Sequence, residues 1–192
     1  MERLIILDTE TTGFDPQDGD RIIEIGCIEL IDMEIGREFQ VYLNPEREIP
    51  EEATKVHGIS NKQVADCPTF REVYEEFLAF IGDAPLVIHY AEFDLSFLNA
   101  ELTRVQSNHA LEMERTIDTV QMARRLYPGS KASLNHLCER FGIDRTGRVF
   151  HGALLDAHLL VDVYTALCRV EDCVEQDIAP IIEVGDSILM KP

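Results

Sequence analysis

The run Leu4-Ile5-Ile6-Leu7-Asp8-Thr9-Glu10 forms the centre of the predicted fold. Four successive apolar residues without polar alternation predict a strand over residues 3–9 that is buried on both faces. Asp8 and Glu10 lie two residues apart at its end, so their side chains leave the same face. A buried carboxylate without a partner is very costly. The pair therefore predicts a site for Mg²⁺ or Mn²⁺, which prefer hard oxygen ligands; the alternative is that these acids simply begin a polar loop.

The rest of the chain changes from strand to helix periodicity near residue 69. Segments rich in β-branched and aromatic residues, joined by short connections, first predict an antiparallel meander. A capping box, Thr69-Phe70-Arg71-Glu72, then opens a region of alternating strands and helices. The predicted strands are 3–9, 21–31, 36–43, 86–89 and 116–119, and the predicted helices are 69–81, 93–105, 120–126, 133–141 and 152–168. This order predicts an α/β, ribonuclease H-like fold, in which helices flank a mixed five-stranded sheet of antiparallel meander plus parallel strands.

Composition excludes several classes of protein. A chain of 192 residues suits one domain of ordinary size, and no segment has the roughly 18 to 20 apolar residues of a membrane span. The first residues do not resemble a signal peptide, so we expect a cytoplasmic protein. Five cysteines without C-x-x-C spacing predict reduced thiols. The net charge of −19 argues against a protein that reads duplex DNA through Lys and Arg contacts to phosphates.

Three further polar residues lie at the ends of predicted elements. Asp94 comes near the start of a helix, where an acid can serve only as a cap. Asp156 lies in the first turns of the last helix, where an acid that complements the helix dipole is the alternative. His151 precedes Asp156 by five residues, about 140° away on an ideal helix. The two therefore border one site only if His151 lies in the loop before the helix, and a lone histidine is more often structural.

Three motifs resemble those of the DEDD exonuclease family in its histidine variant. They are Asp8-Thr9-Glu10-Thr11-Thr12-Gly13, His89-Tyr90-Ala91-Glu92-Phe93-Asp94 and His151-Gly152-Ala153-Leu154-Leu155-Asp156-Ala157. The resemblance runs from about residue 5 to residue 167 and is closest to the epsilon proofreading subunits of bacterial DNA polymerase III. It implies an exonuclease domain over residues 1–169. The remaining segment, 170–192, carries six acids and one lysine, and this composition predicts an acidic appendage that is either loosely docked or binds a partner.

The resemblance implies a reaction and assigns roles to the five motif residues. The reaction is 3′→5′ removal of nucleoside monophosphates from a single-stranded or frayed DNA 3′ end by two-metal hydrolysis. Asp8, Glu10 and Asp156 would hold one Mg²⁺ or Mn²⁺ ion. Asp8 would bridge to a second ion, and Asp94 would complete the site directly or through water. His151 would be the general base that deprotonates the attacking water, since neutral imidazole accepts a proton near neutral pH.

Two more residues receive roles by the same resemblance, and one residue departs from the family pattern. Glu52 and His57 would contact the terminal nucleotide; the alternatives are an early-helix acid and a helix terminator before Gly58. Tyr90 follows His89 where the family commonly has Asn, which puts the fine geometry of the metal-site carboxylates in question but not the ligands.

Cations gather between Arg115 and Arg148, where seven Lys and Arg residues outnumber three acids. Such a cluster is either a solvated face or a phosphate-facing surface. We predict that Arg124, Arg125 and Lys131 contact phosphates upstream of the scissile bond.

The acidity of the whole chain bears on its partners. It fits a subunit that a polymerase delivers to DNA, and the resemblance implies that the partner is the catalytic alpha subunit of polymerase III. Clamp binding is unsupported, because Gln176-Asp177-Ile178-Ala179-Pro180-Ile181 lacks the aromatic residue of clamp-binding motifs.

Two other functions remain open from the sequence. A 3′→5′ exoribonuclease of the same fold, like oligoribonuclease or ribonuclease T, would use the same motifs, because the metals act on a phosphodiester common to DNA and RNA. A non-catalytic binding domain that kept the fold is the alternative from a different class.

Overall fold

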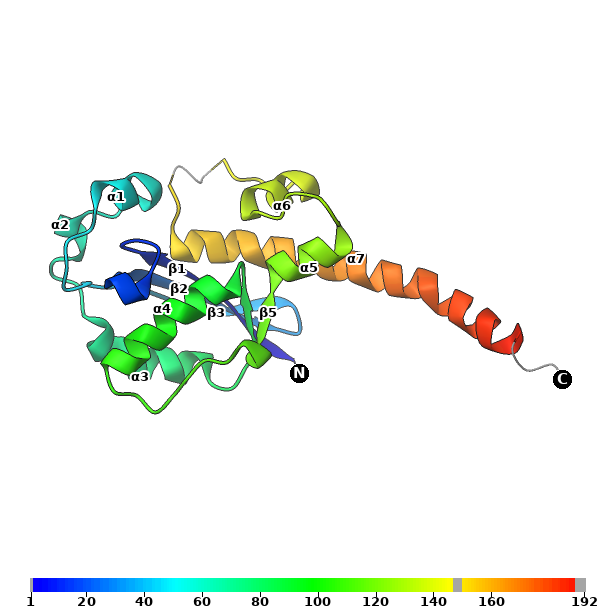
Figure 1. Cartoon of the computed structure of the whole chain (residues 1–192), viewed down its shortest axis with the longest axis horizontal. Coiled ribbons are helices and arrows are strands. Elements are labelled where there is room, and N and C mark those ends of the chain that lie inside the picture. The colour runs from blue at the N-terminus through cyan, green and yellow to red at the C-terminus, as the bar shows by residue number, and fades with distance from the viewer. Residues whose placement is uncertain (1, 147–149, 189–192) are drawn as a thin grey trace.

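A computed structural model describes residues 2–146 and 150–188, with side chains as far as residue 173. Its centre is one five-stranded sheet in the order β3-β2-β1-β4-β5 (Figure 1). The strands are β1 (Arg3–Thr11), β2 (Ile22–Ile31), β3 (Glu34–Tyr42), β4 (Leu86–Ile88) and β5 (Thr116–Asp118). Strands β1, β2 and β3 pair antiparallel, whereas β4 runs parallel to both β1 and β5. The predicted mixed sheet is confirmed.

Helices cover both faces of this sheet. They are α1 (Glu51–His57), α2 (Asn61–Val64), α3 (Phe70–Ile81), α4 (Ala91–Arg104), α5 (Thr119–Leu126), α6 (Leu134–Phe141) and α7 (Ala153–Ile188), with short 3-10 turns η1 (Pro16–Asp18) and η2 (Met113–Arg115). Helices α3 and α4 pack in one apolar core and α5, α6 and α7 in another. Within the described residues, no helix is both long and apolar enough to cross a membrane.

Strand β1 separates these two cores. Leu4 and Ile6 pack among the residues of α5, α6 and α7, whereas Ile5 and Leu7 pack among those of α3 and α4. All four are buried, which confirms the prediction of a strand without an exposed face. Because side chains alternate along a strand, Asp8 and Glu10 continue the face of Leu4 and Ile6, on which α7 lies.

Helix α3 begins at the predicted capping box. The Thr69 hydroxyl and the Glu72 carboxylate interact reciprocally across the first turn, and the Thr69 backbone N–H donates to Glu72 Oε2 at 2.8 Å. This arrangement satisfies N–H groups that the helix itself leaves without an acceptor.

The prediction that the last helix ends near Cys168 is wrong. Helix α7 continues to Ile188 and so includes most of the segment 170–192. No glycine or proline occurs from residue 153 to residue 179, so the backbone stays helical after the apolar periodicity has ended. Figure 1 shows this C-terminal part of α7 extending beyond the other elements. Residues 189–192 lie outside the described part of the chain.

Candidate active site

One cavity of about 740 Å³ lies where β1 and β4 end, beside α1, α4 and the start of α7. It contains all the site residues predicted from the sequence. They are Asp8, Glu10, Glu52, His57, Asp94, His151 and Asp156. Segments far apart in the chain supply these side chains. Strand β1 and helix α1 supply two each, whereas α4, α7 and the loop before α7 supply one each. The prediction that the motif residues converge is therefore confirmed in geometry.

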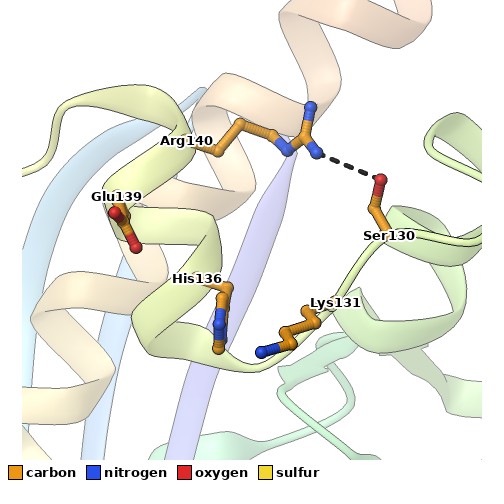
Figure 2. Close-up of a pocket in the computed structure, with 5 residues that line it drawn as sticks. All are labelled: Ser130, Lys131, His136, Glu139 and Arg140. Atoms are coloured by element: carbon orange, nitrogen blue, oxygen red, sulfur yellow. Dashed lines mark hydrogen bonds between the residues drawn. The ribbon is translucent and has the colours of Figure 1, made fainter.

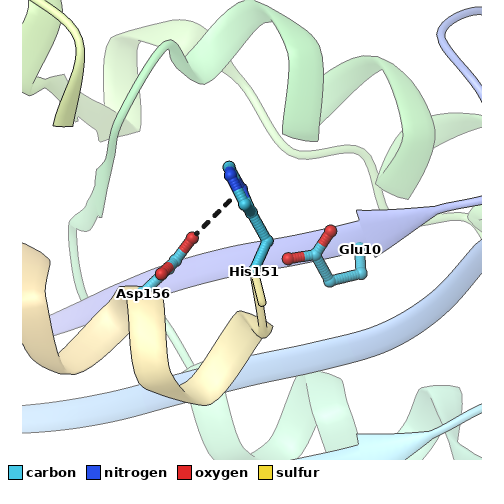
Figure 3. A group of neighbouring side chains, drawn as sticks. All are labelled: Glu10, His151 and Asp156. Carbon is cyan, nitrogen blue, oxygen red and sulfur yellow. Dashed lines mark ion pairs between the residues drawn. The ribbon is translucent and has the colours of Figure 1, made fainter. Parts of the chain in front are cut away.

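Three of these side chains form a tight group (Figure 3). Glu10, His151 and Asp156 each offer one ligand atom, and these atoms lie within 4.8 Å of one another. His151 Nδ1 is 3.6 Å from Asp156 Oδ2. The two residues meet despite their angular separation on a helical wheel, because α7 begins only at Ala153 and His151 lies in the loop before it. Asp8 and Asp94 line the cavity beside this group.

The start of α7 is held close to the sheet by β2. A Cβ atom on Gly26 would lie 2.3 Å from the backbone nitrogen of Leu154, so only glycine permits this approach. Glu24 Oε2 accepts a hydrogen bond from the backbone N–H of Ala153 at 3.0 Å. Its other oxygen accepts one from Gln40 Nε2 at 2.8 Å. A buried carboxylate on β2 thus acts as a long-range cap for α7.

Sequence reasoning missed the role of Glu24. The signal was a charged residue inside the otherwise apolar run Ile22-Ile23-Glu24-Ile25, where a buried charge requires a partner. The register places it directly opposite Glu10 on the neighbouring strand, so both carboxylates leave the same face of the sheet.

Asp94 reaches the cavity from the opposite face of β1. It is 3% exposed and accepts a hydrogen bond from Thr9 Oγ1 at 2.7 Å. Burial raises the pKa of the Asp94 carboxyl to about 7, although the hydrogen bond from Thr9 opposes that shift. Further along α4, Glu101 receives two hydrogen bonds from Arg21, at 2.6 and 3.0 Å, which tie the helix to the segment before β2. These contacts fix α4, and with it Asp94, against the sheet.

His57 presents a hydrogen-bond donor to the cavity. Its Nδ1 atom accepts the backbone N–H of Ile59 at 3.0 Å, so Nε2 carries the proton of the neutral ring. Burial lowers the pKa of this imidazole, and the nearby His151 lowers it further. Nε2 is buried and has no hydrogen-bond partner among the described residues. A buried donor of this kind requires an acceptor, which a ligand in the cavity supplies.

Helix α1 is also joined to the loop that carries His151. The backbone N–H of His151 donates to the carbonyl of Val56 at 3.1 Å. Gly58 ends α1 with a φ of 74°, and a Cβ atom there would lie 2.9 Å from the ring of Phe150. Glu52 lies five residues before His57 on the same helix and is exposed. The alternative considered for His57, a helix terminator before Gly58, agrees with the structure, in which His57 also faces the cavity.

Tyr90, the residue of the second motif that departs from the family pattern, has an unusual backbone conformation. Tyr90 caps α4 with φ 71° and ψ 61°, in the left-handed region, and its side chain makes no cap hydrogen bond. Asparagine adopts this region far more readily than tyrosine. The preceding His89 also lines the cavity, with Nδ1 2.9 Å from Thr119 Oγ1, and burial lowers the pKa of its imidazole to about 4. His89 is therefore neutral near neutral pH.

The donor set fits a divalent cation. Glu10 and Asp156 bring carboxylate oxygens, the ligands that Mg²⁺ and Mn²⁺ prefer, to within 4.8 Å of each other. Glu24 lies directly opposite Glu10, and like charges in such a cross-strand pair repel. A cation held by Glu10 and Asp156 would relieve this repulsion.

Comparison with known proteins agrees with this geometry. A family model described as "Exonuclease" matches residues 5–164. DNA polymerase III subunit epsilon of Rickettsia prowazekii is 52% identical over 168 residues, which cover 86% of this chain and 73% of that protein. The subunit of the same name from Escherichia coli K12 is 42% identical over 174 residues, covering 87% and 72%.

Two solved structures share the fold. Exonuclease X in complex with 5′-overhanging duplex DNA has a TM-score of 0.63 and 29% identity, over 85% of this chain and 92% of that one. The nuclease domain of 3′hExo, a DEDDh family member bound to rAMP, has a TM-score of 0.75 and 23% identity, over 89% and 92%. The family model covers most of the chain and the motif residues surround one cavity, so this chain belongs to that exonuclease family, which depends on divalent metal ions, and within it to the epsilon subunits of DNA polymerase III.

Proposed function

We propose that this chain is the 3′→5′ exonuclease that proofreads for a replicative DNA polymerase. It would release nucleoside monophosphates from single-stranded or frayed DNA 3′ ends. The observation that carries the proposal is the meeting of Glu10, His151 and Asp156 within 4.8 Å, in a cavity that all the other motif residues also line. Its family membership supports the same reaction.

The proposed metal ligands are Asp8, Glu10, Asp156 and Asp94. Two ions of Mg²⁺ or Mn²⁺, when bound, would stabilise the charge on the attacking and leaving oxygens of the phosphodiester. The protein contributes fixed positions for the carboxylates: Asp8 and Glu10 come from the central strand, Asp94 is held by Thr9, and Asp156 lies in the first turn of α7. Because these elements pack tightly, the ligands need little rearrangement to bind the ions.

His151 is the proposed general base. Its Nδ1 atom faces Asp156, so a proton on Nδ1 leaves Nε2 as the ring atom that accepts a proton from the attacking water. Its side chain is 46% exposed, whereas that of Asp156 is 5% exposed. The base therefore lies at the solvent side of the carboxylates, where it can pass its proton to water after each turnover.

The terminal nucleotide is the proposed partner of His57 and Glu52. The Nε2–H of His57 lacks an acceptor among the described residues, and the 3′ oxygen of a terminal nucleotide provides one. Glu52, on the same helix and facing the same cavity, is placed to contact the sugar of that nucleotide.

The proposed protein partner is the alpha subunit of DNA polymerase III, since the related proteins are named as subunits of that polymerase. The C-terminal part of α7, over residues 170–188, is the proposed contact segment. A pull-down from native lysate with and without residues 170–192 tests this point, and polymerase capture that does not depend on the segment would contradict it.

The decisive test compares hydrolysis of DNA and RNA strands by wild-type protein and Asp8→Ala. We expect Mg²⁺- or Mn²⁺-dependent release of nucleoside monophosphates from DNA 3′ ends, and its loss in the variant. Equal activity in purified Asp8→Ala would refute the catalytic assignment and favour a binding domain. A strong preference for RNA would refute the proofreading role and favour an exoribonuclease such as oligoribonuclease or ribonuclease T.

A further inference from the structure

A second hollow, of about 420 Å³, lies outside the active-site cavity, between α6 and the turn that follows α5 (Figure 2). We call it the basic hollow. It is lined by Ser130, Lys131, His136, Glu139 and Arg140. The two cations exceed the single carboxylate by one charge with His136 neutral, in a chain whose net charge is −19.

The structure holds one cation of the basic hollow in place. The Arg140 guanidinium carbon lies 4.1 Å from the centre of the Tyr127 ring, a cation–π contact. Its Nη2 atom donates to Ser130 Oγ at 3.1 Å. Neither contact neutralises the charge of Arg140, because both partners are uncharged. Lys131 is exposed and forms no ion pair with the residues that the structure describes.

The other predicted phosphate contacts do not belong to this hollow. Arg125 pairs with Glu171 on α7, so its charge is already met by a carboxylate. Arg124 is exposed on α5 and lines neither this hollow nor the active-site cavity. The structure therefore retains Lys131 from the predicted set and adds Arg140, which lies four residues after His136 on the same face of α6.

A third hollow joins the basic hollow to the active site. Its volume is about 770 Å³, and it shares Glu139 with the basic hollow and His151 with the active-site cavity. The basic hollow and the third hollow both border α6, whereas the third hollow and the active-site cavity meet at the loop residue His151. A strand whose 3′ end lies beside His151 would pass the third hollow before it reaches the basic hollow.

We propose that the basic hollow binds a backbone phosphate of the substrate strand, upstream of the scissile bond. The proposal rests on the proposed function, because it concerns the strand whose 3′ end lies in the active-site cavity. Lys and Arg supply most of the affinity of proteins for nucleic-acid backbones. An acidic chain that binds a strand needs a local site of this kind, and Arg140 and Lys131 meet a phosphate with charge-assisted hydrogen bonds.

The test measures KM and kcat of the double variant Lys131→Gln/Arg140→Gln on DNA strands of increasing length. We expect KM for a strand of about 12 nucleotides to rise roughly tenfold, and its salt dependence to fall by about 0.7 per lost contact. For a dinucleotide, and for the p-nitrophenyl ester of thymidine 5′-monophosphate, the change should stay below about twofold, because these substrates end before the basic hollow. Lys131→Gln alone, which leaves the Arg140 contacts intact, should show about half of the effect on a logarithmic scale.

The matched control is Lys62→Gln/Arg71→Gln, which removes the same charge at exposed positions outside all three hollows. The proposal is overturned if KM for the long strand is unchanged, if it rises equally for the mononucleotide ester, or if the control variant shows the same rise. Because the ester needs only the active-site cavity and not the basic hollow, failure of this proposal is distinguishable from failure of the proposed function. If the wild-type protein does not hydrolyse the ester, the proposed function is contradicted instead.

Discussion

The active-site cavity has two parts that the fold holds to different degrees. The floor consists of Glu10, Asp94 and Asp156, which are 8%, 3% and 4% exposed. The rim consists of Phe14, Tyr90 and the His151 side chain, which are 89%, 52% and 46% exposed. The floor residues come from packed elements, where carboxylates keep a fixed spacing for cations. The rim residues meet solvent and, in the proposed function, substrate. The proposed metal ligands of the floor are therefore buried, whereas the proposed general base His151 is exposed.

The largest expected effect comes from replacing a carboxylate of the floor. Asp156→Asn keeps the shape of the side chain but removes one charge, so we expect kcat on single-stranded DNA to fall at least about 1000-fold, with weaker Mg²⁺ and Mn²⁺ binding. Steady-state kinetics and calorimetric titration of the ions measure both effects. Asp162→Asn, an exposed acid on the same helix, is the control and should leave both unchanged. If Asp156→Asn retains more than about a tenth of the activity, Asp156 is not a metal ligand.

A change at the rim should separate proton transfer from metal binding. His151→Ala is expected to lower kcat about 100- to 10,000-fold, the usual contribution of general base catalysis, while metal affinity changes less than about threefold. The control is His158→Ala, since His158 lies on α7 and pairs with Glu38 at the surface. A large loss of metal affinity in His151→Ala would show that the histidine is a ligand and belongs to the floor.

Glu24 links the floor to the rim, because it holds the start of α7 next to Glu10. Glu24→Ala leaves the Ala153 N–H without its acceptor, so we expect the free energy of unfolding to fall by about 1–3 kcal/mol. We also expect a lower kcat, as Asp156 and His151 lose their support. Glu24→Gln retains an acceptor oxygen and should lose less in both respects. Urea denaturation and kinetics test this; equal losses for Ala and Gln would mean that the charge, not the hydrogen bond, matters.

The smallest expected effect concerns Tyr90 on the rim. Tyr90→Asn should raise the free energy of unfolding by roughly 1 kcal/mol, because asparagine tolerates the left-handed conformation and is a good N-cap. Tyr90→Ala removes the ring but keeps the strain, so it is not expected to stabilise the protein. Thermal and urea denaturation compare the three proteins. If Tyr90→Asn is less stable than wild type, ring contacts outweigh the backbone strain.

Much of the site was predictable because each motif depends on local rules. The alternation along β1 placed Asp8 and Glu10 on one face, and the helix pattern placed Asp156 at the start of α7. Contacts between elements were not predictable in this way. Arg125 was expected to meet phosphate, yet it pairs with Glu171, which lies 46 residues later in the sequence. The continuation of α7 beyond Cys168 was also missed, since apolar periodicity reports packing and not the length of a helix.

The sequence by itself determined the order of the elements, the faces of β1 and the chemical types of the site residues, because these follow from periodicity and side-chain chemistry within single segments. Only the tertiary structure decided that His151 approaches Asp156, that Glu24 caps α7, and that His57 directs a donor into the cavity. The physical reason is packing. The N-terminus of α7 can rest on β2 only at Gly26, and that close approach sets positions which no local pattern encodes.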